Sequence, residues 1–131
     1  MQVGDVQKEA HLTFYLGMVH ESKKEFKLAI RSYRRFLSCA QNMEDKIGVA
    51  LGMNRIGVNY FNLNRFEKAL EFHLKNVELS DRENSFAAFY NLGINYRSLG
   101  KYEEALDYFR RSLEWARDFR DVESECLSLG Q

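Results

Sequence analysis

The chain has 131 residues, enough for one compact domain, and 45% of them are hydrophobic and 29% charged, as in ordinary globular proteins. Lys plus Arg and Asp plus Glu number 19 each, so no net charge attracts nucleic acid or an anionic membrane surface. Proline is absent, and no apolar run approaches the roughly 18–20 residues that cross a bilayer. The composition therefore favours an all-helical protein and argues against a nucleic-acid or membrane partner.

The two cysteines, Cys39 and Cys126, fit no CxxC pattern and make no disulfide framework. We interpret them as reduced structural thiols of an intracellular protein, with a regulatory thiol as the alternative. The N-terminus lacks the apolar core of a signal peptide. The expected location is therefore the cytoplasm.

Three landmarks recur in register along the chain. Each set begins with an aspartate, and an aliphatic residue followed by glycine comes eleven residues later; in the first three sets an alanine follows the glycine by twelve residues. The landmarks are Asp5, Asp45, Asp81 and Asp118; Gly17, Gly57, Gly93 and Gly130; and Ala29, Ala69 and Ala105. The glycines are 40, 36 and 37 residues apart, so the chain is a repeat written three and a half times.

Two helices are predicted in each repeat. Aspartate is a good N-cap, so the first helix should begin near each aspartate, and turns are expected near Glu21–Lys24, Asn62–Asn64 and Leu99–Lys101. The predicted helices span residues 5–21, 24–41, 45–61, 64–79, 82–98, 101–116 and 119–130. They form one domain over 1–131, with repeats at about 5–44, 45–80, 81–117 and a partial repeat at 118–131.

The landmark glycines and alanines predict close packing between the paired helices, because neither residue has a bulky side chain. A large residue at Ala69 should overpack this seam, at a cost of about 1–3 kcal/mol. The partial fourth repeat should leave an apolar face open, since an array needs a cap at its end. We therefore expect a fragment of a longer array, or self-association through the uncapped C-terminal repeat.

The third copy resembles the tetratricopeptide repeat (TPR) motif, which runs W-x2-L-G-x2-Y, then A, then F or Y, then P. The matching residues are Leu92, Gly93, Tyr96, Gly100, Ala105 and Phe109. The other copies depart from the motif, with His73 at the later aromatic position of the second and His20 at the tyrosine position of the first. The longer, proline-free repeats are similar to those of LGN/Pins scaffolds and of ciliary TPR proteins, which makes a cilium or flagellum the alternative location.

The resemblance implies an all-α, right-handed superhelical stack of antiparallel helix pairs, with seven helices in about 3.5 repeats. It also implies a protein–protein interaction scaffold that holds a peptide segment of a partner in a concave groove lined by the first helix of each pair. The groove positions in this chain are Phe14, Tyr15, Met18 and Ser22; Asn54, Arg55, Val58 and Asn62; and Tyr90, Asn91, Ile94, Arg97 and Ser98.

Several of these residues have specific expected roles. Asn91 occupies the position of an asparagine that binds the peptide backbone in several TPR groups, and Arg55 could pair with a ligand carboxylate. A solvated polar residue is the alternative for both. Tyr90, Phe14 and Tyr15 are either groove anchors or core residues between repeats. The expected ligand is a linear motif of mixed apolar and acidic character.

Other functions have weaker support in the sequence. The chain could be a structural stacking segment of a larger assembly, without a discrete ligand. An RNA-binding helical repeat is disfavoured by the neutral net charge and by the apolar Met18, Val58 and Ile94. His11, His20 and His73 show no metal-ligand spacing, and no Gly-rich phosphate loop is present, so we expect no metal, cofactor or enzymatic activity.

Overall fold

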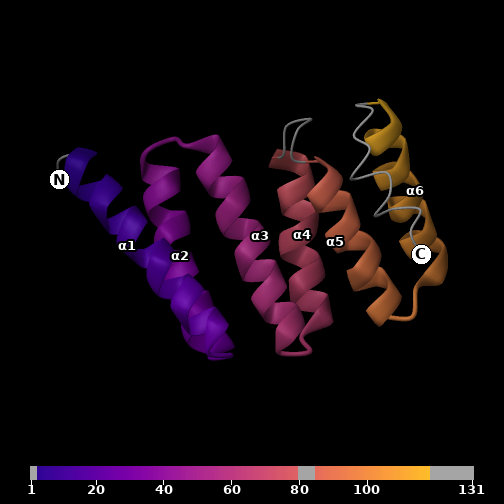
Figure 1. Ribbon diagram of the computed structural model, residues 1–131, viewed down its shortest axis with the longest axis horizontal. Coiled ribbons are helices and arrows are strands. Elements are labelled where there is room, and N and C mark those ends of the chain that lie inside the picture. Colours follow the sequence, from indigo (N-terminus) through magenta and orange to yellow (C-terminus); the bar gives the residue numbers. More distant parts are fainter. Residues whose placement is uncertain (1–2, 80–84, 119–131) are drawn as a thin grey trace. The chain divides into compact units, whose positions relative to one another are not determined.

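The described part of the chain, residues 3–79 and 85–118 of a computed structural model, consists of six helices and contains no strand (Figure 1). The helices are α1 (Val3–Ser22), α2 (Phe26–Asn42), α3 (Lys46–Asn62), α4 (Phe66–Leu79), α5 (Ser85–Ser98) and α6 (Tyr102–Asp118). The predicted all-α class is confirmed. The seventh predicted helix, 119–130, lies outside the described residues.

The helices belong to two compact units, Met1–Leu79 with α1 to α4 and Ser80–Gln131 with α5 and α6. In the first unit α1 packs against α2, α2 against α3 and α3 against α4, and in the second unit α5 packs against α6. The three helix pairs coincide with the first three predicted repeats. The single domain and the handedness of the superhelix stay predictions.

The turn inside each pair has one backbone geometry, although its sequence differs from pair to pair. One residue of each turn has a positive φ: Lys24 (62°), Asn64 (62°) and Gly100 (79°). The next amide donates to a carbonyl five residues back, in Glu25→His20 (2.8 Å), Arg65→Tyr60 (2.9 Å) and Lys101→Tyr96 (2.9 Å). This is the Schellman ending of a helix. It confirms the predicted turns and explains why α2 and α4 begin two residues later than predicted.

The predicted aspartate caps are only partly confirmed. Asp45 is the N-cap of α3, and its carboxylate accepts a hydrogen bond from the Gly48 amide at 3.0 Å. The prediction that Asp5 is an N-cap is wrong, because α1 begins at Val3 and Asp5 lies inside its first turn. In that turn the negative charge of Asp5 still interacts favourably with the positive end of the helix dipole. Asp81 lies outside the described residues, and Asp118 is the last residue of α6.

Each landmark glycine lies against a ring of the paired helix. A Cβ atom added at Gly17 would be 2.6 Å from the Tyr33 ring, one at Gly57 would be 2.8 Å from the His73 ring, and one at Gly93 would be 2.7 Å from the Phe109 ring. Ala29, Ala69 and Ala105 are buried as well. The close approach of paired helices at these positions is confirmed.

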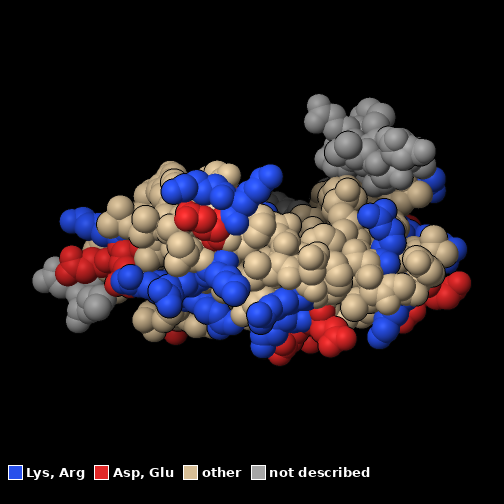
Figure 2. Space-filling view, turned by 90° about the horizontal axis from the view of Figure 1, so that it is seen from below, with Lys and Arg blue, Asp and Glu red and all other residues tan. Residues whose placement is uncertain are grey.

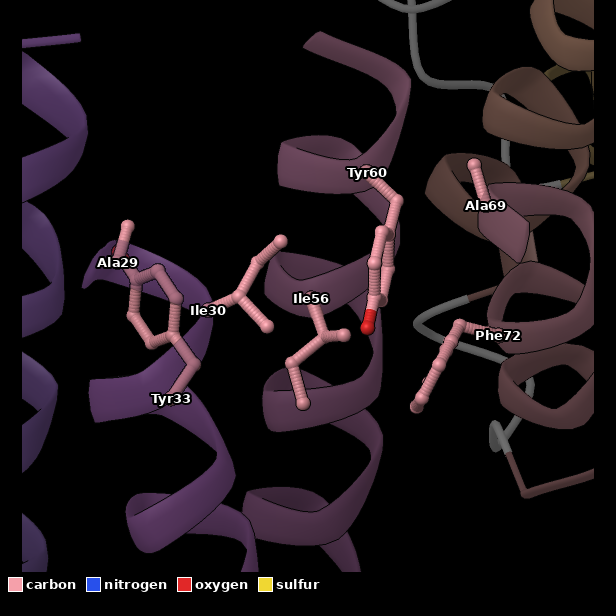
Figure 3. Close-up of a cluster of buried hydrophobic side chains, with 7 residues drawn as sticks. All are labelled: Ala29, Ile30, Tyr33, Ile56, Tyr60, Ala69 and Phe72. Carbon is pink, nitrogen blue, oxygen red and sulfur yellow. The ribbon is translucent and has the colours of Figure 1, made fainter. Parts of the chain in front are cut away.

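The core of the first unit lies where the two helix pairs meet. Seven buried side chains from α2, α3 and α4 form it (Figure 3): Ala29, Ile30, Tyr33, Ile56, Tyr60, Ala69 and Phe72. Tyr60 and Phe72 stack with ring centroids 5.7 Å apart. Because the cluster joins both pairs, the pairs are held together by burial of apolar surface rather than by the connecting turn alone.

Candidate functional site

A groove of about 810 Å³ lies in the first unit, between α1 and the start of α3. Its lining comes from the first helix of each pair, from Phe36 of α2 and from the α2–α3 turn. The lining residues are Gln7, Ala10, His11, Phe14, Tyr15, Met18, Phe36, Met43, Asp45 and Leu51. The structure thus brings together the predicted groove residues Phe14, Tyr15 and Met18, and the surface that they form is mainly apolar.

The three predicted residues of α1 differ in how accessible they are. Phe14 is half-buried and packs edge-on against Tyr33, with ring centroids 5.6 Å apart, and against Phe36 at 4.9 Å. It therefore belongs to the wall of the groove. Tyr15 and Met18 are 56% and 43% exposed, so both can contact a bound molecule.

Two further residues of this groove, His11 and Leu51, were not among the predicted positions, although the repeat register points to them. His11 and Leu51 occupy the same position in the first two repeats, 40 residues apart. His11 lies one helical turn before Tyr15, and Leu51 lies one helical turn before Arg55. The His11 ring lies tilted against the Tyr15 ring, with centroids 5.4 Å apart. Extending the groove positions upstream by one turn would have included both residues.

Arg55, a predicted groove residue of α3, is half-buried and has an internal partner. Its Nη1 lies 3.1 Å from Oε2 and 3.4 Å from Oε1 of Glu21, at the end of α1. Oε1 of Glu21 also accepts hydrogen bonds from the Tyr33 hydroxyl at 3.1 Å and from Asn59 Nδ2 at 3.0 Å. Glu21 thus joins the two helix pairs, and a ligand carboxylate would have to compete with it for Arg55.

Burial and the charges of Glu21 and Arg55 shift the pKa values of two ring side chains, Tyr33 and His73. Burial, and then the negative charge of Glu21, raise the pKa of Tyr33 to about 12, so its hydroxyl remains a donor. Burial, and then the positive charge of Arg55, lower the pKa of His73 to about 4. His73 is therefore a neutral packing residue near pH 7, as the sequence predicted, rather than a charged ligand.

The other predicted α3 positions, Asn54 and Val58, are half-buried, and Asn62 is exposed at the end of the helix. Asn54 takes part in an interaction inside the protein. Their role as ligand contacts stays a prediction.

The second unit contains the remaining predicted residues, all on α5. Tyr90 is 46% exposed and lies against Phe86 and Phe109, with ring centroids 6.2 and 6.0 Å away. Asn91 and Ile94 are half-buried, Asn91 has an interaction partner, and Arg97 and Ser98 are exposed. The two units are described separately, so a groove that combines Tyr90, Asn91, Ile94 and Arg97 with the residues of the first unit stays a prediction.

Cys39 is buried, and burial followed by the nearby Glu9 raises the pKa of its thiol, as expected of a structural cysteine. Cys126 lies outside the described residues. Within residues 3–79 and 85–118, no group of three or more His, Cys, Asp or Glu side chains could hold a metal ion. No helix in these two ranges is long and apolar enough to span a membrane.

Comparison with known families identifies the repeat. A family model described as tetratricopeptide repeat matches residues 48–118, more than half of the chain. The chain therefore belongs to the TPR family, whose members are generally non-enzymatic scaffolds for protein–protein interaction. Among curated proteins, none matches the sequence significantly.

Solved TPR structures share the fold at low sequence identity. The TPR domain of Arabidopsis FLU has a TM-score of 0.79 at 19% identity, covering 88% of this chain and 99% of that domain. The N-terminal domain of stress-induced protein-1 from C. elegans has 0.73 at 21% identity, covering 95% of both chains. BtubC from P. vanneervenii has 0.79 at 20% identity, covering 86% of this chain and 48% of its own. These similarities support the helical-repeat fold.

Proposed function

We propose that this chain is an interaction scaffold that holds an apolar peptide segment of a partner protein in the groove between α1 and α3. The observation that carries the proposal is the exposure of Tyr15 and Met18 on a groove whose lining also includes the apolar Phe14, Phe36, Met43 and Leu51. Aromatic side chains and methionine provide large contact areas, and methionine adapts to ligands of different shape.

The charges near the groove favour a ligand without acidic residues. Lys and Arg are absent from the groove lining, whereas Asp45 contributes a carboxylate. Arg55, the nearest predicted anion contact, already binds Glu21. The proposed ligand is therefore a segment with leucine, methionine or aromatic side chains, and the acidic part of the ligand predicted from the sequence lacks support in this unit.

Peptide selection followed by titration tests this proposal. Peptides selected from a random library on the wild-type chain should be rich in apolar residues and poor in Asp and Glu. Fluorescence anisotropy should show at least about tenfold weaker binding to Met18→Glu and to Tyr15→Glu, because each places a charge in the apolar contact. Both residues are exposed, so the fold should be retained.

Leu74→Glu is the matched control, since Leu74 is 36% exposed on α4, outside the groove. It should bind the selected peptides like the wild type. Selected peptides that are mainly acidic, or that bind Met18→Glu and the wild type equally, would contradict the groove assignment.

A further inference from the structure

Three aliphatic side chains form an exposed stripe on α1. Leu12, Leu16 and Val19 are four and three residues apart, which places them on one side of the helix. They are 66%, 51% and 56% exposed. We call this stripe the front face of α1.

The same repeat positions in α3 are buried. Forty residues after the front face lie Gly52, Ile56 and Asn59, and each of them contacts the preceding helix pair. A Cβ atom at Gly52 would be 3.3 Å from Leu37 of α2, and Ile56 packs in the cluster that contains Ile30. Asn59 donates to Glu21. In α3, therefore, this face is the one that receives the back of another helix pair.

The matching surface is exposed on α6. By the repeat register, Phe26 and Ile30 of α2 correspond to Tyr102 and Leu106 of α6, 76 residues later. Ile30 is 7% exposed because it lies against Ile56, whereas Tyr102 and Leu106 are 64% and 46% exposed. We call these two residues the back face of α6. The described chain thus exposes both halves of the contact that joins its first two pairs.

Charge complements shape at these two faces. Residues 1–79 contain twelve Lys and Arg against nine Asp and Glu, a net charge of +3, and residues 80–131 contain seven against ten, a net charge of −3. Lys8 and Lys23 lie four residues before and after the front face, and Glu103 and Asp107 adjoin the back face. On the surface shown in Figure 2, basic and acidic side chains alternate with uncharged areas, so local pairing rather than one broad field would guide a contact.

We propose that the two faces bind each other between copies of this chain, so that the front face of α1 in one copy docks on the back face of α6 in the next. Leu16 would then contact Leu106 of the next copy as Ile56 contacts Ile30 inside the chain. Such a head-to-tail contact is heterologous, because it joins different surfaces of the two copies.

Sedimentation velocity over a concentration series tests the proposal with complementary variants. The wild type should show a mass that rises with concentration. Leu16→Glu spoils only the front face and Leu106→Glu only the back face, so each alone should associate at least about tenfold more weakly. A mixture of the two retains one intact front face and one intact back face, and should form a 1:1 dimer that grows no further.

Leu28→Glu provides the matched control. Leu28 is 39% exposed on α2, and the corresponding repeat positions are the charged Lys68 and Glu104. This variant should associate like the wild type. Circular dichroism should show wild-type helix content for all three variants, because every replaced leucine is at least one third exposed.

Three results would overturn the proposal. A wild-type chain that stays monomeric at every concentration excludes the contact. Association that is lost in Leu16→Glu and unchanged in Leu106→Glu indicates that two α1 faces meet instead. If residues 119–131 of the same copy cover Leu106, then Leu106→Glu lowers the unfolding midpoint and leaves association unchanged.

Discussion

The helix pairs α1/α2 and α3/α4 are two copies of one repeat in different surroundings. Both have a residue with positive φ in the turn and a glycine that lies against a ring. They differ in the residues that face neighbouring pairs, since Ile56 of α3 is fully buried and its counterpart Leu16 of α1 is half exposed. The contacts inside a pair therefore recur in both copies, whereas the same aliphatic position is buried in α3, where it meets the preceding pair, and exposed in α1.

Truncating these two counterparts should separate the roles of the two helices most clearly. Ile56→Ala should lower the free energy of unfolding by about 2–5 kcal/mol, because it leaves a cavity in the core of the first unit. Leu16→Ala should change it by about 0.5 kcal/mol or less, since Leu16 is exposed. Urea unfolding at low protein concentration, where self-association is negligible, measures both. Similar losses for the two variants would show that α1 is covered on its front face even at that dilution.

The ring that lies against the landmark glycine is Tyr33 in the first pair and His73 in the second. This difference predicts that the stability of the protein depends on pH through His73. Tyr33 donates its hydroxyl to Glu21, whereas Nδ1 of His73 has no hydrogen-bond partner within the described residues. The folded pKa of His73, about 4, lies below its ordinary value of 6.5. Below pH 6.5 the unfolded chain binds a proton that the folded chain does not, so stability should fall as the pH falls toward 4.

The slope from His73 alone should reach about 1.4 kcal/mol per pH unit between these two pKa values and vanish below pH 4. His73→Phe places at this position the residue type that Phe109 provides in the third copy, and it should remove that slope. Because the carboxylates titrate in both proteins, the test is the difference between the urea unfolding free energies of wild type and variant at pH 7, 6, 5 and 4. A difference that is constant with pH would mean that the folded protein accommodates a protonated His73.

The repeat register predicted the fold well, for a physical reason. Small residues opposite large rings are needed in every pair, so Gly17, Gly57 and Gly93 recur in the sequence and locate the helices within a few residues. Asp5 misled the prediction of the first helix start, because a carboxylate is favourable both at the N-cap and in the first turn.

The contact between the pairs could not be predicted in this way. Glu21 corresponds to Phe61 and Arg97 in the other copies, and Arg55 corresponds to Tyr15 and Asn91. Their ion pair therefore has no counterpart at the same positions elsewhere in the chain, and only the packing of the two pairs brings these side chains together. The apolar groove was predictable in part, because Tyr15 and Met18 follow from the glycine register.

The turns provide the smallest expected effect and compare the two pairs at a single residue. Lys24 and Asn64 have the same φ of 62°. A left-handed conformation costs a residue with a Cβ atom about 1–2 kcal/mol. Glycine avoids this cost, but it loses more conformational entropy on folding, which offsets part of the gain. Lys24→Gly should therefore stabilise the protein by about 0.5–1 kcal/mol. Asn64→Gly should raise the free energy of unfolding by less, since asparagine tolerates this conformation.

Gly100, with φ of 79°, allows the reverse test in the third pair. Gly100→Ala should lower the free energy of unfolding by about 1 kcal/mol in the same urea titrations. A loss of stability in Lys24→Gly would mean that the lysine side chain contributes more to the turn than its backbone strain costs.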